Sequence, residues 1–142
     1  MVDLEQIGKN LPALLAAVMV AVLFLQSAVD KMTDWNGNLG WLTEHFSKTF
    51  MAPFVPLLLG TILVMELAAG VLAAVGVLYF VVAATTIIIF WSAVIAAFAL
   101  LSLFFGQRIA KDYPGAVSLL PYFILVLLLI YLTDPVGPHL IK

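Results

Sequence analysis

The chain has 142 residues, of which 65% are apolar and 10% are Asp, Glu, Lys or Arg, whereas soluble domains average roughly 45–50% and 25%. Six basic and eight acidic residues leave a net charge of −2, which excludes the dense basic surface of a nucleic-acid-binding protein. The lack of cysteine excludes disulfides, thiol redox chemistry and cysteine-ligated metal centres. The composition therefore indicates a polytopic membrane protein.

Long stretches without Asp, Glu, Lys or Arg define the membrane spans. A helix of about 20 apolar residues crosses the hydrocarbon core. The stretches 10–29 and 113–133 each fit one span, whereas 67–107, with the apolar residues before it, fits two. The predicted spans lie at about 10–31, 54–76, 80–105 and 114–133.

Helix-breaking residues support these limits. Pro12 suits the start of the first span, the turn between the second and third is expected near Gly76–Phe80, and Pro121 is expected to kink the last. No segment alternates at the period of a strand, and a membrane strand needs a closed barrel. We therefore predict an all-α fold, with residues 1–142 forming a single transmembrane four-helix bundle.

The connection 32–53 is the only long polar one, and it contains a helical apolar stripe. Its members are spaced three, four and four residues apart, and they are Leu39, Leu42, Phe46 and Phe50. We predict a short amphipathic helix at about 38–50 that lies at the membrane interface. Two interpretations stay open: a cover that shields the mouth of the bundle, or a lid over a lipophilic ligand site or a docking surface for a partner.

Glu66 is the one ionisable residue well inside a predicted span. An acidic side chain at the centre of a membrane helix costs roughly 2.5–3.5 kcal/mol, so Glu66 is expected to face the bundle interior and to have a partner. A polar sector at the end of the first span holds the candidate partners of Glu66, which are Gln26, Ser27, Asp30 and Lys31. A lysine ammonium reaches several ångströms along its helix. A Lys31–Glu66 pair is therefore expected.

Three interpretations of this polar group stay open. It is a buried ion pair that fixes helix register, a polar pocket for the head group of a quinone or a lipid, or a proton or ion path through Glu66. Trp91 lies deep in the third predicted span, where it is either a core aromatic or a wall of a cavity for an aromatic ligand. The candidate binding residues are Lys31, Glu66, Gln26, Asp30 and Trp91.

The sequence offers little chemistry of its own. Its two histidines, His45 and His139, are expected on opposite sides of the membrane, which argues against an intrinsic haem. No metal-binding spacing, phosphate loop or catalytic triad pattern occurs. We therefore predict no catalytic residue, no metal site and no intrinsic cofactor, so that a bound small molecule or a partner subunit would carry any electrons.

Two short motifs resemble the DoxX-like family of small four-helix bacterial membrane proteins. They are FLQSAVDK at 24–31 and ELAAGVL at 66–72. Between them lie a polar loop and the segment PLLLG at 56–60. The resemblance covers about 12–133 and places Lys31 and Glu66 at the family's lysine and glutamate. The chain departs from it at Ser27 and Ala28, where many members have glycine.

The resemblance implies a multi-pass protein of the bacterial inner membrane. Members include a subunit of a thiosulfate:quinone oxidoreductase and proteins linked to membrane oxidoreductase complexes. We expect an accessory subunit of a quinone-linked, respiratory-type complex, not catalytic alone, with quinone as a candidate ligand. Its expected partners are membrane lipids and other membrane subunits, and no nucleic acid. The alternatives are a non-catalytic membrane scaffold or assembly protein, and a small transporter that uses Glu66.

Overall fold

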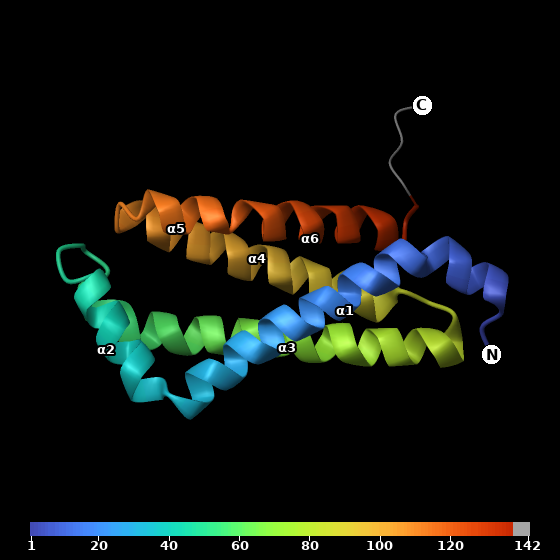
Figure 1. Cartoon of the computed structure of the whole chain (residues 1–142), viewed down its shortest axis with the longest axis horizontal. Coiled ribbons are helices and arrows are strands. Elements are labelled where there is room, and N and C mark those ends of the chain that lie inside the picture. The colour runs from blue at the N-terminus through green and yellow to red at the C-terminus, as the bar shows by residue number, and fades with distance from the viewer. Residues whose placement is uncertain (138–142) are drawn as a thin grey trace.

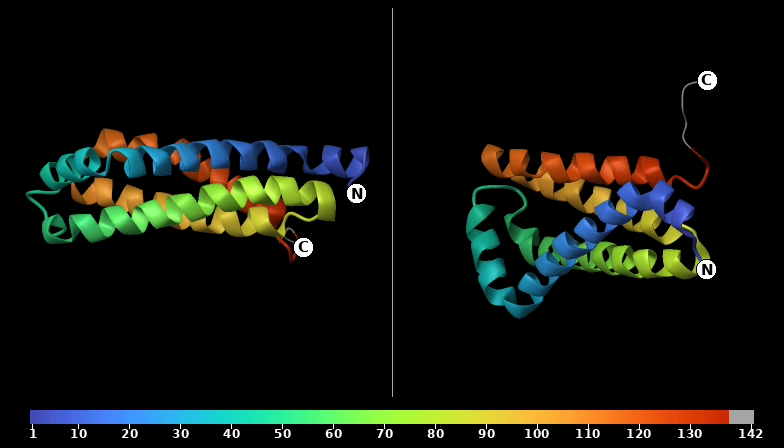
Figure 2. Two further views of the ribbon diagram at one scale, coloured as in Figure 1. Left: turned by 90° about the horizontal axis from the view of Figure 1, so that it is seen from below. Right: turned by 45° about the vertical axis from the view of Figure 1, so that its right-hand side comes forward.

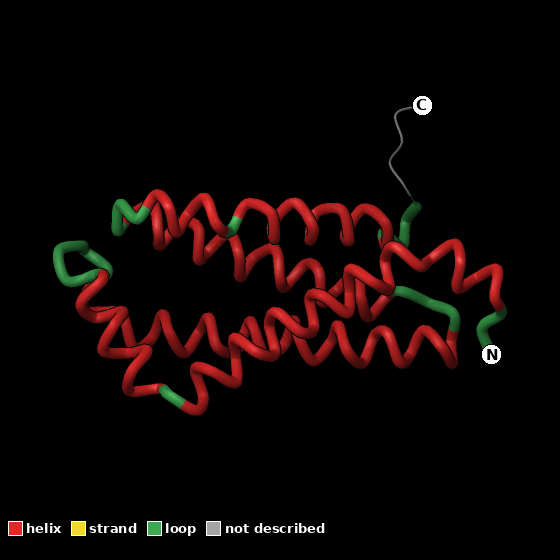
Figure 3. Tube along the Cα trace, viewed as in Figure 1, coloured by secondary structure: helices red, strands yellow, loops and turns green. Residues whose placement is uncertain are grey.

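The computed structural model describes residues 1–137 and consists, over that range, of helices and loops (Figures 1 and 3). The elements are α1 (Leu4–Thr33), α2 (Trp35–His45), the 3-10 turn η1 (Ala52–Phe54), α3 (Val55–Ala83), α4 (Ile87–Ile109), α5 (Tyr113–Ser118) and α6 (Leu120–Thr133). Four segments are long and apolar enough to cross a membrane: α1, η1 with α3, α4, and α5 with α6. The chain is thus a small multi-pass membrane protein with an all-α fold, as predicted. His139 lies outside the described residues.

The four long segments pack as a bundle. α1 packs on α3, α3 on α4, and α4 on α6, while α6 also contacts α1. Figures 1 and 2 show α1 crossing α3 obliquely. Small side chains fill the centre of these contacts, and buried alanines of this core include Ala13, Ala17, Ala69, Ala73, Ala93, Ala96 and Ala99. Because lipid tails are as apolar as the helices, close packing of small residues holds such a bundle together.

α1 begins earlier than the predicted 10, because Asp3 caps it. The Gln6 backbone N–H donates to Asp3 Oδ1 (2.8 Å), and the Asp3 backbone N–H donates to Gln6 Oε1 (3.1 Å), which forms a capping box. Pro12 therefore lies inside the helix, and the prediction that it marks the start is wrong. A proline there removes one helical hydrogen bond and bends the axis, and α1 is bent near its first turns in Figure 1.

The turn between the second and third spans lies at Ala84–Thr86, a few residues after the predicted Gly76–Phe80. α3 continues to Ala83, and Ala84 ends it with a left-handed φ of 52°. Gly76 is buried inside α3, where an added Cβ would lie 2.9 Å from the backbone nitrogen of Ile89. This glycine therefore permits close contact between α3 and α4, and the prediction of a turn there is wrong. As a result α4 runs over Ile87–Ile109 rather than 80–105.

The last span is interrupted near its proline. α5 ends at Ser118 and α6 begins at Leu120, so the interruption that Pro121 predicts lies at Leu119. Because proline has no N–H, it cannot donate to the carbonyl one turn earlier. The two pieces together form one apolar segment from Tyr113 to Thr133.

The connecting helix α2 lies across the end of the bundle where α1 ends and α3 begins (Figures 1 and 2). It spans Trp35–His45 rather than 38–50, and the Asp34 side chain caps it by accepting from the Gly37 backbone N–H (3.2 Å). Phe46 is buried directly after the helix, whereas Phe50 is exposed beyond it. The apolar stripe thus ends at Phe46, because the chain turns away from the bundle there.

Candidate functional site

Glu66 faces the bundle interior, where it is 2% exposed. Lys31 Nζ lies 2.9 Å from Glu66 Oε2 and donates to Ser27 Oγ (2.8 Å), while the Ser27 hydroxyl donates to Glu66 Oε1 (3.0 Å). Oε2 makes no hydrogen bond of good geometry within the described residues, so the attraction between it and the ammonium is mainly electrostatic. The three side chains form a closed polar triangle inside an apolar bundle, and the Lys31–Glu66 pair is present as expected.

A glycine contact between α1 and α3 makes this pair possible. A Cβ added at Gly70 would lie 2.9 Å from the backbone nitrogen of Leu25, so the two backbones touch at this level. Glu66 lies one turn from Gly70 along α3, and Ser27 and Lys31 follow Leu25 along α1 in the opposite direction. At 1.5 Å per residue, Glu66 lies about 16 Å from the start of α3. The end of α1 therefore lies level with the interior of α3.

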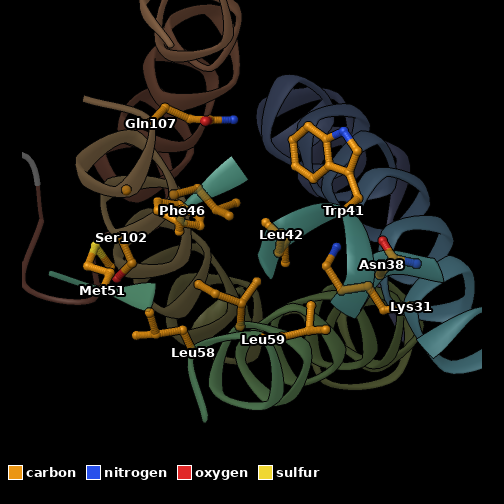
Figure 4. A pocket seen from close by; sticks show the side chains of 13 residues that line it. Lys31, Asn38, Trp41, Leu42, Phe46, Met51, Leu58, Leu59, Ser102 and Gln107 are labelled. Atoms are coloured by element: carbon orange, nitrogen blue, oxygen red, sulfur yellow. The ribbon is translucent and has the colours of Figure 1, made fainter. Parts of the chain in front are cut away.

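A cavity of about 240 Å³ lies between α2 and the ends of α1, α3 and α4. Figure 4 shows Lys31 and Asn38 on one side of it and Met51 and Ser102 on the other. Its apolar walls include Leu42, Phe46, Met51, Leu58, Leu59, Ile62 and Leu103. The polar side chains that line it are Lys31, Asn38, Ser102 and Gln107. The polar triangle thus presents its ammonium to a largely apolar space beneath α2.

Polar and aromatic contacts hold the end of α2 against α4 and the start of α5, beside the cavity. His45 Nε2 lies 2.8 Å from Gln107 Oε1 and 3.7 Å from Asp112 Oδ2. The Trp41 ring stacks on the His45 ring with centroids 4.5 Å apart. Phe46 lies against Gly106, where an added Cβ would be 3.4 Å from the phenyl ring. The end of α2 is therefore tied to the end of α4 and the start of α5.

The structure separates the other predicted site residues from the pair. Gln26 and Asp30 are exposed on another face of α1 and do not line the cavity. Trp91 is 55% exposed near the start of α4, where it contacts Phe90 edge to face. It lies at the end of the bundle opposite α2, so the expectation of a deep or core tryptophan is wrong. The cause is the late start of α4 at Ile87.

The sequence placed Ser27 with Lys31, because residues four apart share one face of a helix, and the structure brings both to Glu66. The polar residues Asn38, Ser102 and Gln107, which line the cavity with Lys31, were not predicted. Gln107 and His45 meet across the bundle, and no local pattern predicts that contact. Among residues 1–137, no group of His, Asp and Glu side chains gathers closely enough to hold a metal ion.

No protein-family model matches the chain, and no curated protein or solved structure is significantly similar to it. The resemblance to the DoxX-like family therefore rests on the motifs at 24–31 and 66–72. It stays a prediction.

Proposed function

We propose that this membrane protein binds the head group of a lipophilic, quinone-type molecule in the cavity beneath α2. The observation that carries the proposal is the Lys31 ammonium, which the buried Glu66 holds at the wall of a largely apolar space. Ligand sites typically combine apolar walls with a few polar groups that fix the orientation of the ligand. Here Lys31 and Gln107 supply N–H donors for the carbonyl oxygens of such a head group, whereas the Asn38 amide already donates to the Asp34 and Asp30 carbonyls.

The volume of the cavity suits the head-group ring of such a molecule but not the whole molecule with its tail. Its volume of about 240 Å³ is below the roughly 300–1,000 Å³ of sites that enclose drug-sized molecules. A single ring system fits this volume, and its apolar tail would lie among the lipids that surround the bundle. A lipid-soluble carrier such as a quinone has this division into a compact polar ring and a long apolar tail.

We further propose that the protein is an accessory subunit of a quinone-linked oxidoreductase complex in the bacterial inner membrane. The motifs at 24–31 and 66–72 support this assignment through their resemblance to the DoxX-like family. Large apolar side chains such as Leu78, Phe98 and Phe105 are exposed along the helices, and they suit contact with lipid or with the helices of other membrane subunits. In this proposal the partner subunits carry the electrons.

The cavity contains its own optical probe, because Trp41 lines it. We expect decylubiquinone to quench the tryptophan fluorescence of the purified protein in nanodiscs in a saturable manner. Trp41→Phe should remove most of the saturable quenching. Trp91→Phe should keep it, since Trp91 lies at the opposite end of the bundle. Quenching that does not saturate, or that depends on Trp91 instead, would overturn the proposed site.

The subunit assignment has a separate test. We expect the tagged protein, extracted from its native membrane in mild detergent, to elute as a particle that contains redox subunits and quinone. Protein identification by mass spectrometry and quinone extraction would establish the composition of this particle. A particle that contains this chain alone would overturn the assignment as an accessory subunit.

A further inference from the structure

The donors and charges around Lys31 limit which head groups the cavity accepts. A lysine ammonium has three N–H donors. One is directed to Ser27 Oγ (2.8 Å), whereas the Glu66 carboxylate, 2.9 Å away, is held mainly by charge. Within residues 1–137 the ammonium has no further protein acceptor, and Lys31 lines the cavity. Lys31 therefore keeps at least one N–H donor to offer a ligand.

The same pair removes the positive charge that an anion would need. Of the described residues that line the cavity, Lys31 alone is charged, and the buried carboxylate of Glu66 compensates it. An anionic ligand would compete with Glu66 for the ammonium. Glu66 is 2% exposed and cannot regain water, so weakening its attraction to Lys31, its one cation within residues 1–137, is costly. A neutral carbonyl oxygen accepts the free N–H without this competition.

We infer that the cavity selects an uncharged hydrogen-bond acceptor, such as a ketone or quinone carbonyl, over a carboxylate or phosphate head group. Glu66 is then a specificity-determining residue, which acts on the ligand through Lys31. This inference rests on the proposed function, because it concerns the ligand class of the same cavity. It predicts a preference between two molecules that differ only in the charge of the head group.

Competition against decylubiquinone tests the inference with such a pair. Undecan-2-one and decanoate have nearly equal chain lengths, but the first is a neutral ketone and the second an anion at pH 8. In zwitterionic nanodiscs we expect the ketone to reverse the quenching of Trp41 at a concentration at least about tenfold lower than decanoate, after correction for partitioning into the lipid. Equal potency, or greater potency of decanoate, would overturn the inference.

Glu66→Gln provides the decisive variant, because it leaves the Lys31 charge uncompensated. We expect decanoate to compete at least about tenfold better with this variant than with the wild-type protein. The matched control is the double variant Lys31→Gln/Glu66→Gln, which has no charge at the site and should show no gain for decanoate. An unchanged preference in folded Glu66→Gln would contradict the inference.

The outcomes separate the two proposals. If decylubiquinone produces no saturable quenching in the wild-type protein, the proposed function fails. If it quenches but the anion competes as well as the ketone, the charge selection alone fails. Should size-exclusion chromatography show that Glu66→Gln aggregates, the wild-type comparison of the two competitors decides the question by itself.

Discussion

A lysine near each end of α1 pairs with a glutamate, Lys9 with Glu5 of the same helix and Lys31 with Glu66 of α3. At the start of α1, Lys9 Nζ lies 2.6 Å from Glu5 Oε1, and the side chains are 71% and 74% exposed. At its end, Lys31 Nζ lies 2.9 Å from Glu66 Oε2, and the side chains are 15% and 3% exposed. The distance between the charges therefore does not distinguish the pairs, whereas burial does.

Burial decides what each pair contributes to stability. An exposed pair four residues apart on a helix stabilises by about 0.3–0.5 kcal/mol, since water and salt screen it. A buried pair gains little over an apolar contact, but removal of one partner leaves an uncompensated charge that costs about 3–5 kcal/mol. The Glu5–Lys9 pair is dispensable by this argument, while Lys31 and Glu66 depend on each other.

The largest effect is expected from Lys31→Met, which leaves Glu66 buried without its cation. The free energy of unfolding should fall by about 3–5 kcal/mol, as measured by circular dichroism during titration with a denaturing detergent. Lys9→Met is the matched control, with an expected loss below about 0.5 kcal/mol. Lys31→Met/Glu66→Gln should recover most of the loss, and failure to recover it would show that the charge on Glu66 is not its cause.

A smaller loss is expected from Gly70→Val, which separates α1 from α3. The added atoms would meet the backbone nitrogen and side chain of Leu25, and overpacking of this kind costs about 1–3 kcal/mol. Gly60→Ala in the same helix is the control, because its Cβ would lie 3.8 Å from Trp35, an ordinary contact. Equal effects of the two substitutions in the same detergent titration would show that the helices do not touch at Gly70.

The fold class and the four spans could be predicted from the sequence, whereas the residues at which the helices begin and end could not. Length and apolarity define four spans, because a membrane helix must satisfy its own backbone hydrogen bonds. Gly76 misled the prediction, since glycine in a membrane helix serves close packing as readily as it ends a helix in water. The start of α1 was missed because Asp3 and Gln6 were not interpreted as a cap.

Only one residue of the candidate site could be predicted with its role, because burying its charge in a membrane span costs so much free energy. Glu66 stands out because few carboxylates lie inside membrane spans. Gln26 and Asp30 lie beside Ser27 and Lys31 in the sequence, but successive residues of a helix point in directions about 100° apart. Which of these two faces meets α3 depends on the crossing at Gly70. That crossing is a tertiary feature without a local signal, whereas the apolar stripe in the loop did indicate the helix that covers the end of the bundle.

A third prediction concerns the hydroxyl that links the buried pair. Ser27→Ala removes the donor to Glu66 Oε1 and one acceptor of Lys31. The free energy of unfolding should fall by about 0.6–1.7 kcal/mol, from the average to the largest value measured for hydrogen bonds between membrane helices. Ser118→Ala is the control, because its exposed hydroxyl bonds to the carbonyl of Gly115 nearby in the chain. Similar losses in the two variants would mean that Ser27 adds nothing specific to the pair.

The smallest effect, and the sharpest test of the comparison, is the response to salt. Screening shortens from about 10 Å at 0.1 M to about 3 Å at 1 M, but it acts only where ions approach the charges. The small loss in Lys9→Met should therefore disappear at 1 M NaCl, whereas the large loss in Lys31→Met should remain. Detergent titrations of both variants and the wild-type protein at the two salt concentrations measure this difference. If salt abolished the loss in Lys31→Met as well, ions would reach Glu66, and burial would no longer explain why the two pairs differ.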